Sequence, residues 1–144
     1  MREGSWDECM ETGSVLEATR ESFKIRSLVE TARGRVKYLE GNRKTEDNAN
    51  YLFEGYYTSV LEMLHAVLLS DGYKVSNHVC AGYYLRDVLK REDMFRDFND
   101  LRFKRNSLTY YGRRMDFRKA GESIRKSLLL MQKLGQILDH KPGK

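Results

Sequence analysis

The chain has little of several things that mark particular protein classes. It contains one proline and two cysteines in 144 residues. Cys9 and Cys80 lie far apart, and neither has a second cysteine or a histidine at the spacing of a zinc site. His65, His78 and His140 show no paired spacing either. We therefore expect two reduced thiols, no metal and no cofactor.

Long apolar runs are also missing. The best candidate, residues 51–69, is interrupted by Glu54, Glu62 and His65, which excludes a membrane-spanning helix. The N-terminal stretch MREGSWDECMETG is acidic and polar, whereas a signal peptide has an apolar core. We therefore expect a cytoplasmic protein with no membrane partner. Glycine-rich phosphate loops, paired carboxylates and nucleophile elbows are absent too, which weakens the ordinary enzyme classes.

What the chain does have is a composition typical of amphipathic helices. Apolar residues make up 40% and charged residues 33% of the sequence, which suits long helices around a single core. No stretch alternates apolar and polar residues in the manner of a strand. The net charge of +5 is compatible with an anionic partner and equally with ordinary solubility. The length predicts one domain.

Apolar stripes and turn residues predict an all-α fold. We expect an up-and-down antiparallel bundle of four to five main helices, preceded by a short N-terminal helical segment. The segment covers residues 1–13 and closes at Gly13, the bundle covers residues 14–139, and residues 140–144 form a disordered tail.

Capping residues set the expected starts of the main helices. Ser14 is the predicted N-cap of the first, with Glu17 as its capping-box partner, and Ser76 is the predicted cap of the third. The expected main helices cover residues 14–40, 46–70, 77–90, 93–110 and 116–139.

One stretch, residues 99–112 (NDLRFKRNSLTYYG), places a charge where an apolar side chain is expected. On a helix, Arg105 shares an apolar stripe with Leu101 and Leu108. A guanidinium does not lose its charge, so a half-buried arginine needs an anion or several acceptors. That partner is either an external phosphate or an internal carboxylate or helix-end carbonyl.

Two stretches of the sequence carry a family resemblance. Residues 56–85 (YYTSVLEMLHAVLLSDGYKVSNHVCAGYYL) look like a central helix, a glycine turn and a following helix start that bears a histidine. Residues 105–112 (RNSLTYYG) look like a signature of arginine, polar residue, short spacer and histidine. Together they resemble the HEPN family (higher eukaryotes and prokaryotes nucleotide-binding domain), in particular its small stand-alone prokaryotic and archaeal members. The resemblance covers roughly residues 15–138 in helix order.

The resemblance implies a homodimer that binds nucleotide or RNA. Matched residue by residue, Arg105 takes the family arginine, Asn106 the polar residue beside it, and Tyr110 the position of the family histidine. The nucleotide- or RNA-binding residues expected on this basis are Arg102, Arg105, Asn106, Tyr111 and Arg113. The helix end that carries them is expected near the dimer interface.

Two alternatives follow from the same resemblance. One is a metal-independent endoribonuclease with Arg105, Asn106 and Tyr110 as the catalytic set, in which the arginine steadies the charged phosphorus transition state. A tyrosine in the histidine position is a poor base at pH 7, because its ordinary pKa is about 10. The other is a toxin–antitoxin partner of a small nucleotidyltransferase, which would attach a nucleotide to Tyr110 or Tyr111. Both tyrosines are equally compatible with simple packing.

Overall fold

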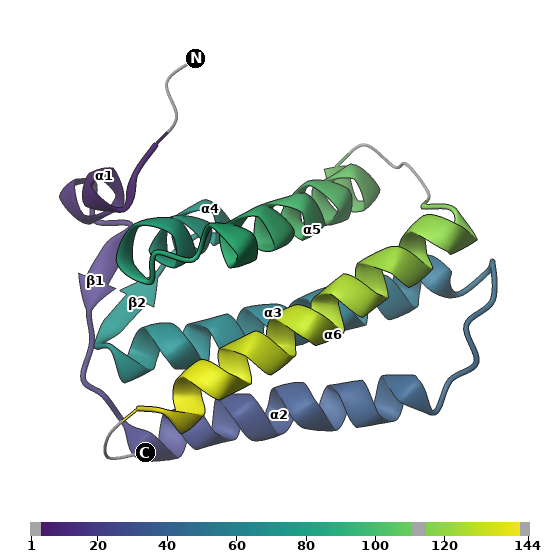
Figure 1. Cartoon of the computed structure of the whole chain (residues 1–144), viewed down its shortest axis with the longest axis horizontal. Coiled ribbons are helices and arrows are strands. Elements are labelled where there is room, and N and C mark those ends of the chain that lie inside the picture. Colours follow the sequence, from purple (N-terminus) through teal and green to yellow (C-terminus); the bar gives the residue numbers. More distant parts are fainter. Residues whose placement is uncertain (1–3, 111–114, 142–144) are drawn as a thin grey trace.

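The computed structural model describes residues 4–110 and 115–141, without the side chains of residues 109 and 110. Over these ranges the fold is all-α, as predicted, with one small two-stranded sheet beside the helices. The long helices run up and down in an antiparallel bundle (Figure 1). No helix in the described ranges is long and apolar enough to cross a membrane.

Three long helices form the larger part of the bundle: α2 (Ser22–Glu40), α3 (Ala49–Ser70) and α6 (Phe117–Asp139). Helix α3 packs against both of the others and is the central element (Figure 1). Its apolar residues cover nearly the whole circumference, so it buries side chains on several faces. The buried set includes Phe53, Tyr57, Val60, Leu64, Val67 and Leu68.

The second part of the bundle is α5 (Glu92–Tyr110), which follows the short α4 (His78–Tyr83) and its π-helical continuation η1 (Tyr84–Val88). Phe98 of α5 stacks on Tyr57 of α3, with ring centroids 6.0 Å apart. Both rings are buried, so this stack joins α5 to the central helix.

Acidic residues of α5 join it to α6. Lys126 Nζ lies 2.8 Å from Asp100 Oδ2, and Lys133 Nζ lies 3.0 Å from Asp93 Oδ2. Hydrogen bonds from Arg91 and Lys133 keep the pKa of Asp93 well below its ordinary value. These acids are therefore already paired on the side of α5 that faces α6.

A short sheet stands where the first long helix was expected to begin, so the predictions of a Ser14 cap and of no strand were wrong. β1 (Val15–Glu17) pairs antiparallel with β2 (Tyr73–Val75), and the buried Val15 lies opposite the buried Val75. Helix α2 begins later in the chain. The sheet depends on a partner far away in the sequence, which a local capping pattern cannot reveal.

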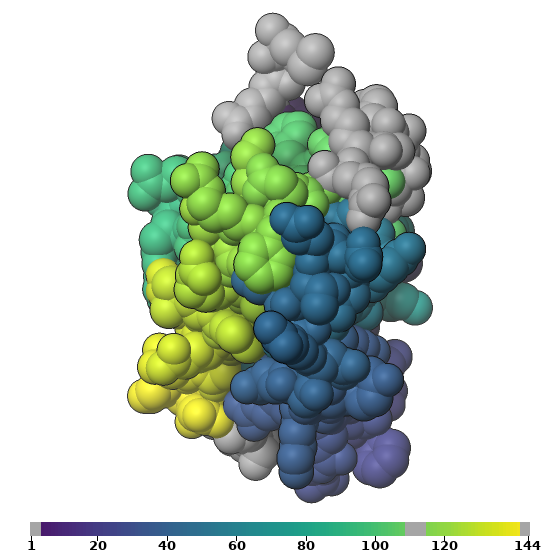
Figure 2. Space-filling model, turned by 90° about the vertical axis from the view of Figure 1, so that its right-hand side faces the viewer, coloured from purple at the N-terminus to yellow at the C-terminus, as the bar shows by residue number. Residues whose placement is uncertain are grey.

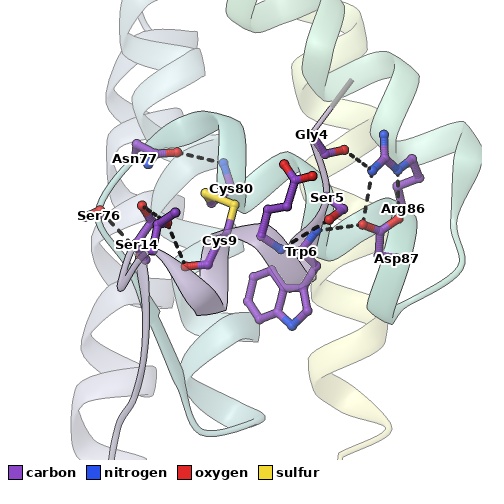
Figure 3. The surroundings of a disulfide bond; sticks show 12 residues. Gly4, Ser5, Trp6, Cys9, Ser14, Ser76, Asn77, Cys80, Arg86 and Asp87 are labelled. Atoms are coloured by element: carbon purple, nitrogen blue, oxygen red, sulfur yellow. Dashed lines mark hydrogen bonds and ion pairs between the residues drawn. A yellow bond between two sulfur atoms is a disulfide. The ribbon is translucent and has the colours of Figure 1, made fainter. Parts of the chain in front are cut away.

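The N-terminal segment forms the helix α1 (Trp6–Glu11), as predicted, and Gly13 ends it with a φ of +79°. Its Cys9 forms a disulfide with Cys80 of α4 (Figure 3). The expectation of two reduced thiols was therefore wrong, because the fold brings two cysteines 71 residues apart to a Cα–Cα distance of 6.1 Å. Trp6 adds a buried contact to Tyr84, with ring centroids 5.5 Å apart.

Two residues of the predicted tail lie within the described part of the chain. Residues 140 and 141 are described, and the amine of Lys141 forms an ion pair with Asp71, at the end of α3. The rest of the predicted tail, residues 142–144, lies outside the described residues.

Candidate anion-binding site

One pocket lies between the first turn of α4 and the second half of α5. It has a volume of about 430 Å³, and we call it the arginine pocket. It is lined by Ser76, Asn77, His78, Val79, Arg102, Arg105 and Asn106. None of these lining residues is acidic, so two permanent positive charges face a pocket without a carboxylate.

The α4 side of the pocket is built by a helix cap. Asn77 is the N-cap, and its Oδ1 accepts a hydrogen bond of 2.8 Å from the backbone N–H of Cys80 (Figure 3). The predicted cap, Ser76, instead donates its backbone N–H to the carbonyl of Ser14, because it continues the strand pairing. The cap and the disulfide at Cys80 together fix the turn that carries His78.

His78 is held in the pocket by a buried tyrosine. Its Nδ1 lies 3.0 Å from Tyr57 Oη, and the Tyr57 ring is fixed in turn by its stack on Phe98. His78 was not among the predicted site residues. The only signal in the sequence was its place in the histidine-bearing helix start of the resemblance.

The α5 side of the pocket carries Arg102 and Arg105, which lie about one turn apart and so project from similar faces. Arg102 donates a 2.8 Å hydrogen bond to Asn99 Oδ1 and lies over the Phe103 ring, 4.8 Å from its centroid. Neither contact neutralises its charge. Arg105 pairs with no carboxylate within residues 4–110 and 115–141. The internal ion pair that the sequence left open is therefore not found in the described chain.

The pocket charges act on the tyrosine–histidine pair. Burial lowers the pKa of His78 below its ordinary value, and Arg105, His65 and Arg102 lower it further. Burial raises the pKa of Tyr57 to about 12, although Arg105 and Arg102 act in the opposite direction. At neutral pH the pocket therefore holds a neutral imidazole beside a protonated phenol.

The structure brings together three of the predicted site residues, Arg102, Arg105 and Asn106, in one pocket. Tyr110 is the last residue of α5, and its side chain is outside the described part. Tyr111 and Arg113 lie outside the described residues altogether. Within the described residues, no group of three or more His, Cys, Asp or Glu side chains could hold a metal ion.

A second pocket, of about 460 Å³, lies between the first half of α2 and the end of α6. We call it the mixed-charge pocket. Its charged lining residues are Arg20, Arg26, Glu30, Arg33, Asp139 and Lys141. Unlike the arginine pocket, it contains acids among its bases.

Comparison with known proteins adds no relative. No protein-family model, no curated protein and no solved structure matches the chain. The case for the arginine pocket therefore rests on its own geometry and charge.

Proposed function

We propose that the protein is an HEPN-like nucleotide- or RNA-binding protein whose arginine pocket holds a phosphate group. The observation that carries this proposal is the pair Arg102 and Arg105, which line a pocket without acidic residues. An arginine fork matches the oxygens of a phosphate in geometry and in charge. The amide of Asn106 adds an uncharged donor on the same helix.

The size of the pocket and the strength of such contacts are adequate for this role. A volume of about 430 Å³ lies in the range of small-ligand sites. A hydrogen bond to a charged group contributes about 1.5–3 kcal/mol. One arginine contact therefore accounts for roughly a tenfold to hundredfold change in affinity.

Binding of labelled single-stranded RNA, followed by fluorescence anisotropy, tests the proposal. We expect Arg105→Ala to weaken binding by roughly tenfold or more. Arg26→Ala is the matched control, because it removes an arginine from the mixed-charge pocket and changes the net charge equally. We expect its effect to be less than about twofold, the loss typical of one screened surface charge. Equal losses in the two variants would indicate nonspecific attraction and would contradict the proposal.

We also propose that the protein forms a homodimer whose interface lies near the C-terminal end of α5. Exposed aromatic side chains at this end support the proposal: Tyr51 is 73% exposed, Phe103 59% and Phe117 39%. The starts of α3 and α6 meet here, where Asn50 Oδ1 accepts a 2.9 Å hydrogen bond from the Met115 N–H. Figure 2 shows this face, with the segment before α3 beside the start of α6.

Light scattering tests the dimer. We expect a dimer for the unaltered protein and a monomer for Phe103→Asp, because a charge in an apolar interface must lose its water. Phe103 is exposed, so the substitution leaves the core intact. A monomer at every concentration of the unaltered protein would contradict this part of the proposal.

A further inference from the structure

The hydrogen bond between Tyr57 and His78 has a direction that the surroundings determine. The phenol is buried, and within the described chain His78 Nδ1 is the partner of its oxygen. With a pKa of about 12 the phenol keeps its proton at neutral pH. A buried O–H without an acceptor is costly, so Tyr57 donates to Nδ1.

This direction fixes the proton on the imidazole. A neutral histidine carries one N–H, and when Nδ1 accepts a hydrogen bond the proton is on Nε2. No residue in the described ranges forms a hydrogen bond with Nε2 of His78, and the side chain lines the arginine pocket. His78 therefore offers the pocket a donor, from the side opposite the two arginines of α5.

The charge of the pocket indicates which phosphate it suits. A phosphodiester has one negative charge and two terminal oxygens, whereas a phosphate monoester has a charge of about −1.5 to −2 at pH 7 and three terminal oxygens. Arg102 and Arg105 supply two fixed positive charges and face no acid among the lining residues. His78 supplies a further donor and is able to take up a proton. Two to three positive charges, with the Asn106 amide as an uncharged donor, match the charge and the three terminal oxygens of the monoester better than those of the diester.

We propose that the arginine pocket recognises a terminal phosphate monoester, with His78 as its third ligand beside Arg102 and Arg105. This inference rests on the proposed function and specifies the ligand class of the same site. A terminal phosphate of this kind occurs on a free nucleotide and at the end of an RNA strand.

Binding at such a site takes up a proton. The groups that act on His78 are Tyr57 and His65 of α3 and Arg102 and Arg105 of α5. In the empty pocket the two arginines oppose a third positive charge. In the imidazolium Nδ1 carries a proton and donates to Tyr57 Oη, so protonation reverses the hydrogen bond between the two residues. A bound dianion offsets the charges of the arginines and favours this charged form, so the pKa of His78 is higher in the complex than in the free protein. Affinity should therefore rise as the pH falls, until the phosphate itself takes up a proton at about pH 6.

The experiment compares two RNAs of identical sequence, one with a 5′-phosphate and one with a 5′-hydroxyl, at about pH 6.5 and about pH 8. We expect the phosphorylated strand to bind roughly tenfold more tightly, with the larger preference at the lower pH. A free nucleoside monophosphate is the competitor. Strong competition supports a nucleotide as the source of the phosphate, and its absence, with the preference intact, supports an RNA end.

Two variants of His78 separate its role as a hydrogen-bond donor from its ability to take up a proton. His78→Ala removes both and should lower the preference by roughly fivefold or more. His78→Gln keeps an amide donor but does not titrate, so it should retain part of the preference and lose its pH dependence. His140→Gln is the control, because His140 is exposed and lines neither pocket, and its ring forms a hydrogen bond with the Gln136 carbonyl of its own helix end. It should behave as the unaltered protein does.

The outcomes distinguish this inference from the proposed function. Arg105-dependent RNA binding without any preference for the phosphorylated strand would overturn the inference and leave the proposed function standing. A preference that His78→Ala does not change would remove His78 from the site and overturn it as well. RNA binding that does not depend on Arg105 would overturn both.

Discussion

The two pockets of this molecule are almost equal in volume, but they differ in whether acidic residues line them beside the basic ones. The arginine pocket, of about 430 Å³, has two guanidinium groups and no acid in its lining. The mixed-charge pocket, of about 460 Å³, includes Glu30 and Asp139 among its bases, and its Lys141 is paired with Asp71. Of these two pockets, the one of larger volume is thus the one that carries both signs of charge in its lining.

This difference indicates that the signs of charge in a pocket's lining predict its ligand better than the volume of the pocket does. A charged group removed from water needs a partner, and the lining of the mixed-charge pocket includes two carboxylates beside its basic residues. The lining of the arginine pocket includes no carboxylate, and Asp100, the acid of α5 nearest in sequence to its arginines, is paired with Lys104 and Lys126. An external anion is the partner that this arrangement favours.

The largest expected effect comes from the loss of the Cys9–Cys80 disulfide. This cross-link anchors α4, which forms one side of the arginine pocket, and neither cysteine lies on an element that lines the mixed-charge pocket. The cross-link joins residues 71 apart, and the loss of such a loop constraint costs roughly 4 kcal/mol of unfolding free energy. We expect Cys9→Ser/Cys80→Ser to lose about that much in urea denaturation. The same result should follow when the unaltered protein is reduced. Equal denaturation midpoints with and without reductant would contradict the prediction.

The second prediction concerns an acidic residue added to the arginine pocket, so that its lining carries both signs of charge as the mixed-charge pocket does. Asn106→Asp places a carboxylate in the lining of the arginine pocket, one helical turn from Arg102, with almost no change of shape. We expect RNA affinity to fall by roughly tenfold to hundredfold, because the acid pairs with the arginine and repels phosphate. Asn42→Asp is the control for net charge, since Asn42 is exposed and belongs to neither pocket. A similar loss in both variants would mean that the position of the charge does not matter.

The smallest expected effect comes from the reverse change. Glu30→Gln/Asp139→Asn removes the acids of the mixed-charge pocket and leaves its bases in place. We expect RNA affinity to rise by less than about threefold, since largely exposed charges are screened by water and salt. Anisotropy titrations at one salt concentration measure this. A gain as large as the loss in Asn106→Asp would show that the two pockets differ only in their acids.

The parts of the fold that the sequence predicts are those with local signals. The long helices carry apolar residues at steps of three and four, and α6 begins after Asp116, whose Oδ1 caps the Lys119 N–H at 2.8 Å. The sheet and the disulfide join segments far apart in the chain. No local pattern marks Val15 for Val75 or Cys9 for Cys80, so the sequence could not reveal either pairing.

The residues of the candidate site likewise include some with a local signal in the sequence and one that depends on a distant segment. Arg105 is recognisable because a charge on an apolar stripe is a local anomaly, whereas Arg102 and Asn106 were expected on the basis of the family resemblance. The contribution of His78 depends on Tyr57, which reaches it from another helix. Their hydrogen bond exists only once α3 and α4 are packed, so the sequence alone could not assign His78 to the pocket.

The salt dependence of RNA affinity tests the central claim most directly. Each phosphate contact made by a basic side chain steepens the fall of affinity with salt by a slope of about 0.7 for single-stranded RNA. The unaltered protein should therefore show a slope steeper than that of Arg105→Ala by about one phosphate contact. Parallel lines for the two proteins, with the same affinity at every salt concentration, would show that Arg105 meets no phosphate and would contradict the account.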